Sequence, residues 1–239
     1  LYALNRQDAS VDTTLSNELT ALAGHSFIGC LVLDSRGWLW AATNETGFCV
    51  LDLKSRKKIQ IPEVPASEPG HTQGQPARFV SCFAPDPLTG NMLIGTSSHG
   101  LLIYDAVIKA LRAPHTEALQ NMNIQSLLVR KDGAILIGSE NRGIWVFDRN
   151  TESARPLNVP NNVVLLEHSK VHALLEDTDG NLWAGLYQKG LFIIPKTISG
   201  FEYFAITDDL SGRNSSCVCA FTRDAGGNLW IATDGGGVF

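Results

Sequence analysis

The chain has 239 residues, of which 44% are hydrophobic and 18% charged, a composition that excludes an intrinsically disordered protein. Its formal net charge of −5 and the lack of a long basic run argue against a nucleic-acid-binding surface. No apolar run approaches the length needed to cross a bilayer.

A turn motif of the type Asp-x-x-Gly recurs along the chain and ends each time in a glycine that tolerates positive φ. Its five copies end at Gly37, Gly90, Gly133, Gly180 and Gly227. Each copy is followed by a small residue and then by a second glycine, namely Gly47, Gly100, Gly143, Gly190 and Gly237. These second glycines are spaced 53, 43, 47 and 47 residues apart. A period of this length is typical of a solenoid or a propeller.

Short apolar runs surround each turn, and they predict strands because they are four to six residues long and rich in Ile, Val, Leu, Trp and Phe. The first runs of the units are 28–33, 80–84, 124–129, 171–175 and 218–221. A second run follows each turn, a third follows each second glycine, and a weaker fourth precedes the next unit. Four short strands per repeated unit predict an all-β β-propeller of four-stranded antiparallel blades. We expect about five repeat units, approximately 1–47, 48–100, 101–143, 144–190 and 191–237, as part of a larger propeller.

The chain begins and ends in the same phase of the repeat. Residues 1–4 match the strand that follows a second glycine, and Val238 and Phe239 repeat that phase at the other end. We therefore interpret the sequence as a piece of a longer array, although closure into a five-bladed ring would pair residues 1–4 with residues 229–233. Residues 1–26 are predicted to supply two strands and then a loop through Leu19–His25. The longest break, 62–78, is interpreted as an elaborated loop because the glycine spacing resumes after it.

Two copies carry a family resemblance: 174–185 followed by Gly190-Leu191-Phe192, and 224–233 followed by Gly235-Gly236-Gly237. They resemble the two-component regulator propeller repeat, and five copies extend the resemblance over essentially the whole chain. Two turns depart from the pattern, since 86–90 has an extra residue and Arg130 replaces the leading aspartate before Gly133. These departures weaken single turns and leave the register unchanged.

The resemblance implies a periplasmic ligand-sensing propeller of a hybrid two-component histidine kinase of the Bacteroides type. In such a protein this region is the sensor part of an inner-membrane kinase and is not itself an enzyme. Its partners would be a small-molecule ligand such as an oligosaccharide and the remainder of the membrane-anchored kinase, and a homodimer is compatible with this role. An alternative is a propeller enzyme such as a polysaccharide lyase or hydrolase, and a third is a propeller used only for protein–protein contact.

No cofactor or metal site is predicted. The turn at Asp177 resembles the start of a calcium loop, but its glycine comes too early and no glutamate closes the loop. His168 and His172 are placed on a loop and a strand entry, which does not suit a shared metal. The five cysteines fall at small or apolar repeat positions and are predicted to be free thiols in the interior. The equivalent Trp40, Trp183 and Trp230 are predicted to pack in the core.

The repeated turns are near-identical between units, whereas the loops at the opposite blade ends vary and are polar. Variable loops on a rigid scaffold commonly carry recognition. The ligand is therefore predicted to bind the end that carries these variable loops, through directional and charge-assisted hydrogen bonds. The candidate ligand-binding residues are Arg78, His99, Arg142, Lys170, His172, Tyr187, Gln188, Lys189 and Arg213.

Overall fold

The computed structural model describes residues 3–4, 8, 10–23, 27–44, 47–62, 79–159, 166–196, 202–204, 217–234 and 236–239. Most of the predicted long loop at 62–78 lies outside these residues. Contacts divide the chain into two compact units. Unit 1 comprises Leu1–Thr96 and Leu102–Ala113, and unit 2 comprises Ser97–Leu101 and Pro114–Phe239.

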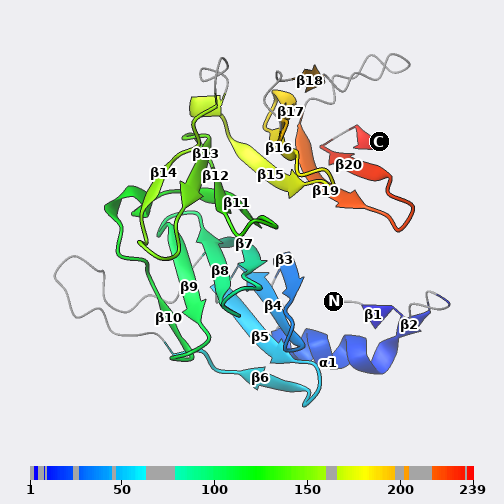
Figure 1. Ribbon diagram of the computed structural model, residues 1–239. Helices are drawn as coiled ribbons and strands as arrows, with labels where there is room; N and C mark the ends of the chain where they lie inside the picture. Colours follow the sequence, from blue (N-terminus) through cyan, green and yellow to red (C-terminus); the bar gives the residue numbers. More distant parts are fainter. Residues whose placement is uncertain are drawn as a thin grey trace. The chain divides into compact units, whose positions relative to one another are not determined.

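Unit 1 contains two four-stranded antiparallel sheets, each built from consecutive strands (Figure 1). The strands of the first sheet are β3 (Ile28–Leu33), β4 (Trp38–Thr43), β5 (Gly47–Asp52) and β6 (Lys57–Ile59). The strands of the second are β7 (Val80–Pro85), β8 (Met92–Thr96), β9 (Leu101–Asp105) and β10 (Ala110–Arg112). The two sheets share a core in which Trp40, Met92 and Ile94 are fully enclosed.

Unit 2 repeats the arrangement with two complete sheets and one of three strands. A short 3-10 helix, η1 (Glu117–Leu119), precedes them. The strands are β11 (Ile124–Val129), β12 (Ile135–Ser139), β13 (Ile144–Phe147) and β14 (Ala154–Pro156); β15 (Val171–Glu176), β16 (Leu182–Leu186), β17 (Gly190–Ile194) and β18 (Glu202–Phe204); and β19 (Val218–Arg223), β20 (Leu229–Thr233) and β21 (Gly237–Val238). Leu136, Leu182 and Phe192 belong to one core shared by the first two of these sheets. The prediction of small antiparallel blades in an all-β propeller fold is confirmed.

The N-terminal segment differs from its prediction. Strands β1 (Ala3–Leu4) and β2 (Val11–Asp12) pair with each other. Pairing of residues 1–4 with residues 229–233 stays a prediction. Residues Thr13–Ala23 form helix α1 where a loop was predicted from Leu19. The side chain of Asp12 accepts a hydrogen bond from the Leu15 amide at 2.9 Å, as an N-cap does. Within the described residues no helix combines the length and apolar character required of a membrane span.

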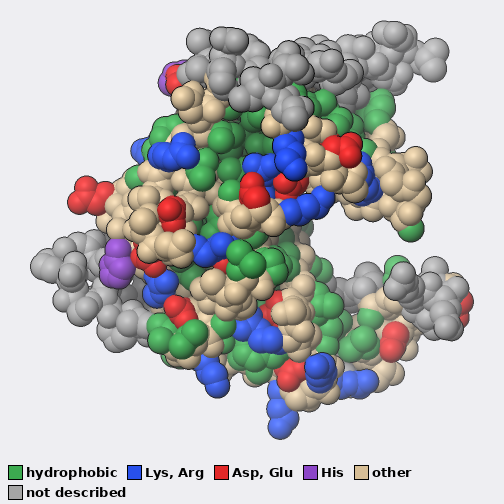
Figure 2. Space-filling model, in the orientation of Figure 1, with side chains coloured by type: hydrophobic (Ala, Val, Ile, Leu, Met, Phe, Trp, Pro, Cys, Tyr) green, Lys and Arg blue, Asp and Glu red, His purple; other side chains and the backbone are tan. Residues whose placement is uncertain are grey.

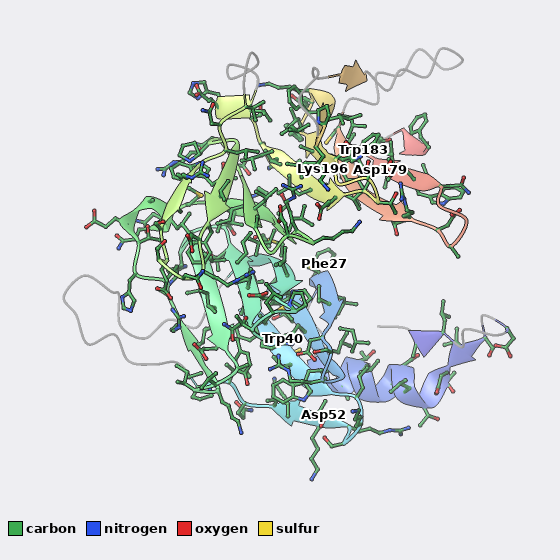
Figure 3. The ribbon with its side chains drawn as sticks, in the orientation of Figure 1. Phe27, Trp40, Asp52, Asp179, Trp183 and Lys196 are labelled. Atoms are coloured by element: carbon green, nitrogen blue, oxygen red, sulfur yellow. The ribbon has the colours of Figure 1, made fainter. Side chains whose placement is uncertain are left out.

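The Asp-x-x-Gly turns are held by their aspartates. In the turn before β16, Asp177 accepts hydrogen bonds from the amides of Asp179 and Asn181 and from the indole Nε1 of Trp183, the last at 2.8 Å. Figure 3 shows Trp183 beside this turn. Burial alone would raise the pKa of Asp177, but these donors outweigh it and the pKa is lowered. The tryptophan that follows such a turn therefore binds the turn carboxylate as well as packing.

The tryptophan prediction is only partly correct. Trp40 is fully buried, and its Nε1 donates to Asp34 at 3.0 Å. Trp230 makes the same bond to Asp224 at 3.1 Å, but 45% of its side chain is exposed, which contradicts a core position. It lies in the last described sheet, whose strands carry mostly exposed or half-buried residues.

Both glycine sets adopt positive φ, between 66° and 88°, at all ten positions. At the small-residue position, a Cβ on Gly138 would lie 2.9 Å from Val171 in the next sheet, and one on Gly185 would lie 2.9 Å from Val218. The small residue therefore lets the first strand of one sheet approach its neighbour closely.

Candidate functional site

Each of the five larger sheets has a β-bulge at the start of its first strand. The register shifts between Ile28 and Cys30 in β3, and the same shift recurs in β7, β11, β15 and β19. The extra residues are Gly29, Ser81, Gln125, His172 and Cys219. A bulge redirects a side chain and is over-represented beside active sites. The bulges lie at the blade ends that carry the variable loops.

In four of these sheets the loop between the second and third strands is hydrogen-bonded to the residue that precedes the first strand. In β15–β18, the Tyr187 amide donates to the Lys170 carbonyl at 2.9 Å. Equivalent bonds run from the Glu140 amide to Asn123 and from the Asp234 amide to Cys217, both at 2.9 Å, and from the Asn44 amide to Phe27 at 3.3 Å. The repeated backbone bond therefore places one variable loop residue beside each bulge.

In unit 2 these residues form a polar cluster, which we define as Glu140, Lys170, His172 and Tyr187. Lys170 Nζ lies 3.0 Å from Glu140 Oε2, which joins the β12–β13 loop to the start of β15. Lys170 Nζ also lies 5.3 Å from the centre of the Tyr187 ring, and the His172 and Tyr187 ring centres are 5.4 Å apart. The cluster thus contains a cation, an anion, an imidazole and a phenol from two neighbouring sheets.

Two polar atoms of the cluster are enclosed by protein and lack a hydrogen-bond partner: His172 Nε2 and Glu140 Oε2. The contact between Glu140 and Lys170 is thus an ion pair without hydrogen-bond alignment. Burial, reinforced by the charge of Lys170, lowers the pKa of His172, while Glu140 and Asp234 oppose that shift. His172 is therefore neutral at pH 7, with one ring nitrogen able to accept a hydrogen bond.

The surrounding loops supply further donors. Lys189 Nζ donates a hydrogen bond to the hydroxyl of buried Ser169 at 3.0 Å. Gln188, in the same loop, has a positive φ of 56°. Arg142 is exposed in the β12–β13 loop, and its amide donates to Ser139 Oγ at 2.8 Å. Lys170, His172, Tyr187, Gln188 and Lys189 therefore gather on one sheet, with Arg142 on the loop that supplies Glu140.

The other predicted residues are not part of this cluster. His99 lies in the β8–β9 loop, where its Nδ1 is 2.8 Å from Ser98 Oγ. Arg78 and Arg213 lie outside the described residues. Within the described part of the chain, no group of three or more His, Cys, Asp or Glu side chains could hold a metal ion.

Glu140 is not among the residues predicted from the sequence, although it lies in a variable loop. The available signal was its repeat position, which matches Tyr187 and Asp234. Cys219 is another departure, because it occupies a bulge and is exposed, whereas an interior position was predicted. Burial of its sulfur, together with nearby Cys217, still raises the pKa of the Cys219 thiol. All five cysteines are free thiols.

The position equivalent to Lys170 is aromatic in both sheets of unit 1. Phe27 and Phe79 precede β3 and β7 at the position that Lys170 occupies before β15, and their side chains are 73% and 58% exposed. Phe79 has a φ of 66°, which is uncommon for a bulky residue. The cation that Lys170 supplies in unit 2 therefore has no counterpart at this position in unit 1.

Comparison with known proteins agrees with the repeat pattern. Residues 165–188 match the two component regulator propeller model, and this segment contains Lys170, His172 and Tyr187. No curated protein matches the chain in sequence.

Several solved structures share the fold. The extracellular domain of BT3049, a proposed hybrid two component system from B. thetaiotaomicron, matches with a TM-score of 0.65 and 19% identity over 100% of this chain and 28% of its own. The extracellular domain of BT4673, a proposed one component system from the same organism, matches with a TM-score of 0.65 and 16% identity over 99% of this chain and 28% of its own.

PorZ, a surface component of the type-IX secretion system of Porphyromonas gingivalis, has a TM-score of 0.62 and 16% identity over 96% of this chain and 34% of its own. The chain thus spans about a third or less of the length of the structures it matches. Its sheets are propeller blades, and the chain carries the two component regulator propeller repeat.

Proposed function

We propose that the chain is the ligand-sensing part of a periplasmic sensor in a hybrid two-component signalling protein. The proposal is supported by the matched repeat at 165–188 and by the fold shared with extracellular domains of such systems. We assign recognition to this region and phosphoryl chemistry to a histidine kinase in the remainder of the protein.

The observation that carries the binding role is the polar cluster of Glu140, Lys170, His172 and Tyr187. Sugar hydroxyls both donate and accept hydrogen bonds, so they match a site that contains a carboxylate, a neutral imidazole, an ammonium group and a phenol. The exposed Tyr187 ring, 40% accessible, also offers an apolar face to a pyranose ring. We therefore propose a carbohydrate fragment as the ligand class.

The nearby cations favour an acidic sugar. Lys189 and Arg142 lie on the loops around the cluster, and within it Lys170 is paired with the anion Glu140. A uronate carboxylate would form charge-assisted bonds with these donors, which are stronger than bonds between neutral groups. Occupancy would be relayed to the kinase by ordering the variable loops of neighbouring blades.

The test is calorimetric titration with neutral and uronate-containing oligosaccharides. The double variant Arg142→Ala/Lys189→Ala is expected to weaken binding of the uronate oligosaccharide at least tenfold. Lys170→Ala should also weaken binding and release Glu140. The matched control is Arg155→Ala/Lys196→Ala, which removes two exposed cations elsewhere in unit 2. Unchanged binding by Arg142→Ala/Lys189→Ala, or an equal loss of binding in the control, would contradict the proposal that the ligand binds here.

A further inference from the structure

The turns of unit 1 that face away from the bulges meet at one end, which we call the turn end of unit 1. The β3–β4 turn contacts the second sheet there, because Arg36 Cζ lies 5.1 Å from the Tyr104 ring centre. The β7–β8 and β9–β10 turns are joined by a hydrogen bond from the Ala106 amide to Asn91 Oδ1 at 2.8 Å. These bonds make the turn end a fixed surface.

Three large aliphatic side chains stand exposed on this surface. Leu88 in the β7–β8 turn is 68% exposed, and Val107 and Ile108 in the β9–β10 turn are 85% and 54% exposed. Their backbones are held by turn carboxylates, since Asp86 accepts from the Leu88 amide and Asp105 from the Val107 amide. Because these side chains are directed to solvent by capped turns, core packing does not account for them.

The aliphatic residues are accompanied by exposed basic residues. These lie in the β5–β6 turn and strand β6, and in the β9–β10 turn: Lys54, Arg56, Lys57, Lys58 and Lys109. Within the described residues, Lys57, Lys58 and Lys109 form no ion pair with a carboxylate. Figure 2 shows Lys and Arg side chains near green hydrophobic ones at the lower edge of the view, where Figure 1 places β6 and the β9–β10 turn.

The acidic residues of these turns are occupied locally. Asp52 accepts bonds from the Lys54 amide and the Ser55 hydroxyl, and Asp105 binds Arg112 at 3.3 Å. Asp34 is buried and binds Arg36 at 2.7 Å. The free charge at this end is therefore positive, although the whole chain carries a net charge of −5.

We propose that the turn end of unit 1 docks on the surface of a lipid bilayer that contains anionic phospholipid. Lysines attract anionic headgroups, and Leu88, Val107 and Ile108 enter the interfacial region where their apolar surface leaves water. The composition favours a bilayer over an acidic protein, because protein interfaces are depleted in Lys. This inference is independent of the ligand proposed above, and it concerns a different unit of the chain.

The test is sedimentation of the chain with vesicles of phosphatidylcholine, with and without about one third phosphatidylglycerol. The chain is expected to bind only the vesicles that contain phosphatidylglycerol and to dissociate as salt is raised. The variant Lys57→Glu/Lys58→Glu should weaken binding by about thirtyfold or more, since each basic residue near an anionic surface contributes about 1 kcal/mol. Val107→Ser/Ile108→Ser should reduce the binding that persists at high salt.

The charge-matched control is Arg155→Glu/Lys196→Glu, which changes two exposed basic residues of unit 2 and should bind vesicles as the parent does. Circular dichroism establishes that each variant is folded. Equal binding by the parent and by Lys57→Glu/Lys58→Glu would overturn the proposal, as would equal loss in the control. Failure of the parent to bind phosphatidylglycerol vesicles while it binds polyglutamate would assign the surface to an acidic protein instead.

Discussion

Two constraints can require glycine at the second glycine position of the repeat: a positive φ, and the close approach of another backbone atom. Gly143 has a φ of 66°, and a Cβ there would overlap the backbone carbonyl oxygen of Leu166. Gly237 has a φ of 85° but no atom within 4 Å of the corresponding Cβ position. A backbone atom cannot move aside as the end of a flexible side chain can, so the two sites differ in steric cost.

Gly143→Ala is therefore expected to destabilise the chain by about 3 kcal/mol or more, and Gly237→Ala by about 1 kcal/mol, the cost of positive φ alone. Urea denaturation of both variants measures the difference. Gly29→Ala is the control, because Gly29 has neither positive φ nor a neighbour within 4 Å. Similar losses at Gly143 and Gly237 would show that the approach of Leu166 is unimportant.

The lowered pKa of His172 predicts how the stability of the fold changes with pH. Its folded pKa lies below the usual 6.5, chiefly because of burial and then because of Lys170. The unfolded state therefore binds more protons in the window just below pH 6.5, so stability falls as the pH falls through that window. His172→Gln should flatten this part of the stability profile.

An NMR titration of the histidine ring signals checks the same prediction directly. The His172 signals should titrate below pH 6.5, and Lys170→Met should raise the midpoint by removing a nearby positive charge. A His172 midpoint at or above 6.5 in the parent would contradict the prediction.

At the scale of elements, the turn before β12 shows how a lost aspartate is replaced. Arg130 stands at the aspartate position, and its guanidinium reaches the next sheet to bind Glu176 Oε1 at 3.0 Å and the Gly180 carbonyl at 3.2 Å. The Lys131 amide donates to the other oxygen of Glu176 at 2.7 Å. The substitution that the sequence analysis took as a weakening of one turn instead links two blades.

Arg130→Ala is expected to cost about 1.5–3 kcal/mol, because the side chain of Glu176 is only 7% exposed and would keep its charge without its main partner. Thermal denaturation measures this loss. Glu176→Gln alone and combined with Arg130→Ala complete a double-mutant cycle, in which we expect a coupling energy of at least about 1 kcal/mol. Additive effects would mean that the ion pair does not join the blades energetically.

Strand positions were predictable from sequence because glycines and turn aspartates fix the turns locally. The first strand of three sheets extends one or two residues further than predicted, to Pro85, Glu176 and Arg223, because pairing with the second strand continues to the turn. Helix α1 was missed because it does not follow the repeat. The division into repeat units at the second glycines stays a prediction.

The cluster was predictable in part. The repeat placed Lys170, His172 and Tyr187 on one blade end, but periodicity says nothing of which side chains meet across neighbouring blades. The contact between Glu140 and Lys170 depends on the relative placement of β12–β13 and β15, which follows from the close approach at Gly138. The bulges could not be predicted from the sequence either, because a strand with one extra residue has no distinct sequence pattern here.

At the scale of the molecule, sheets are built from consecutive strands while cores are shared between neighbouring sheets. Phe192 in β17 packs in one cluster with Leu136 and Ile144 of the preceding sheet. Ile94 in β8 likewise packs with Trp40 and Val50 of the sheet before it. Local pairing alone would let each blade open separately, whereas a shared core couples the opening of two blades.

Hydrogen exchange measured by mass spectrometry distinguishes these outcomes. Phe192→Ala is expected to cost about 3–5 kcal/mol and to lower protection in β11–β14 as well as in β15–β18. Ile94→Ala should lower protection in both β3–β6 and β7–β10. Ala154→Gly, on an outer strand outside the core cluster, is the control and should affect little beyond β14. A cavity in a core that couples two sheets lowers the stability of both sheets. If each core variant loses protection only in its own sheet, the shared clusters do not couple the blades.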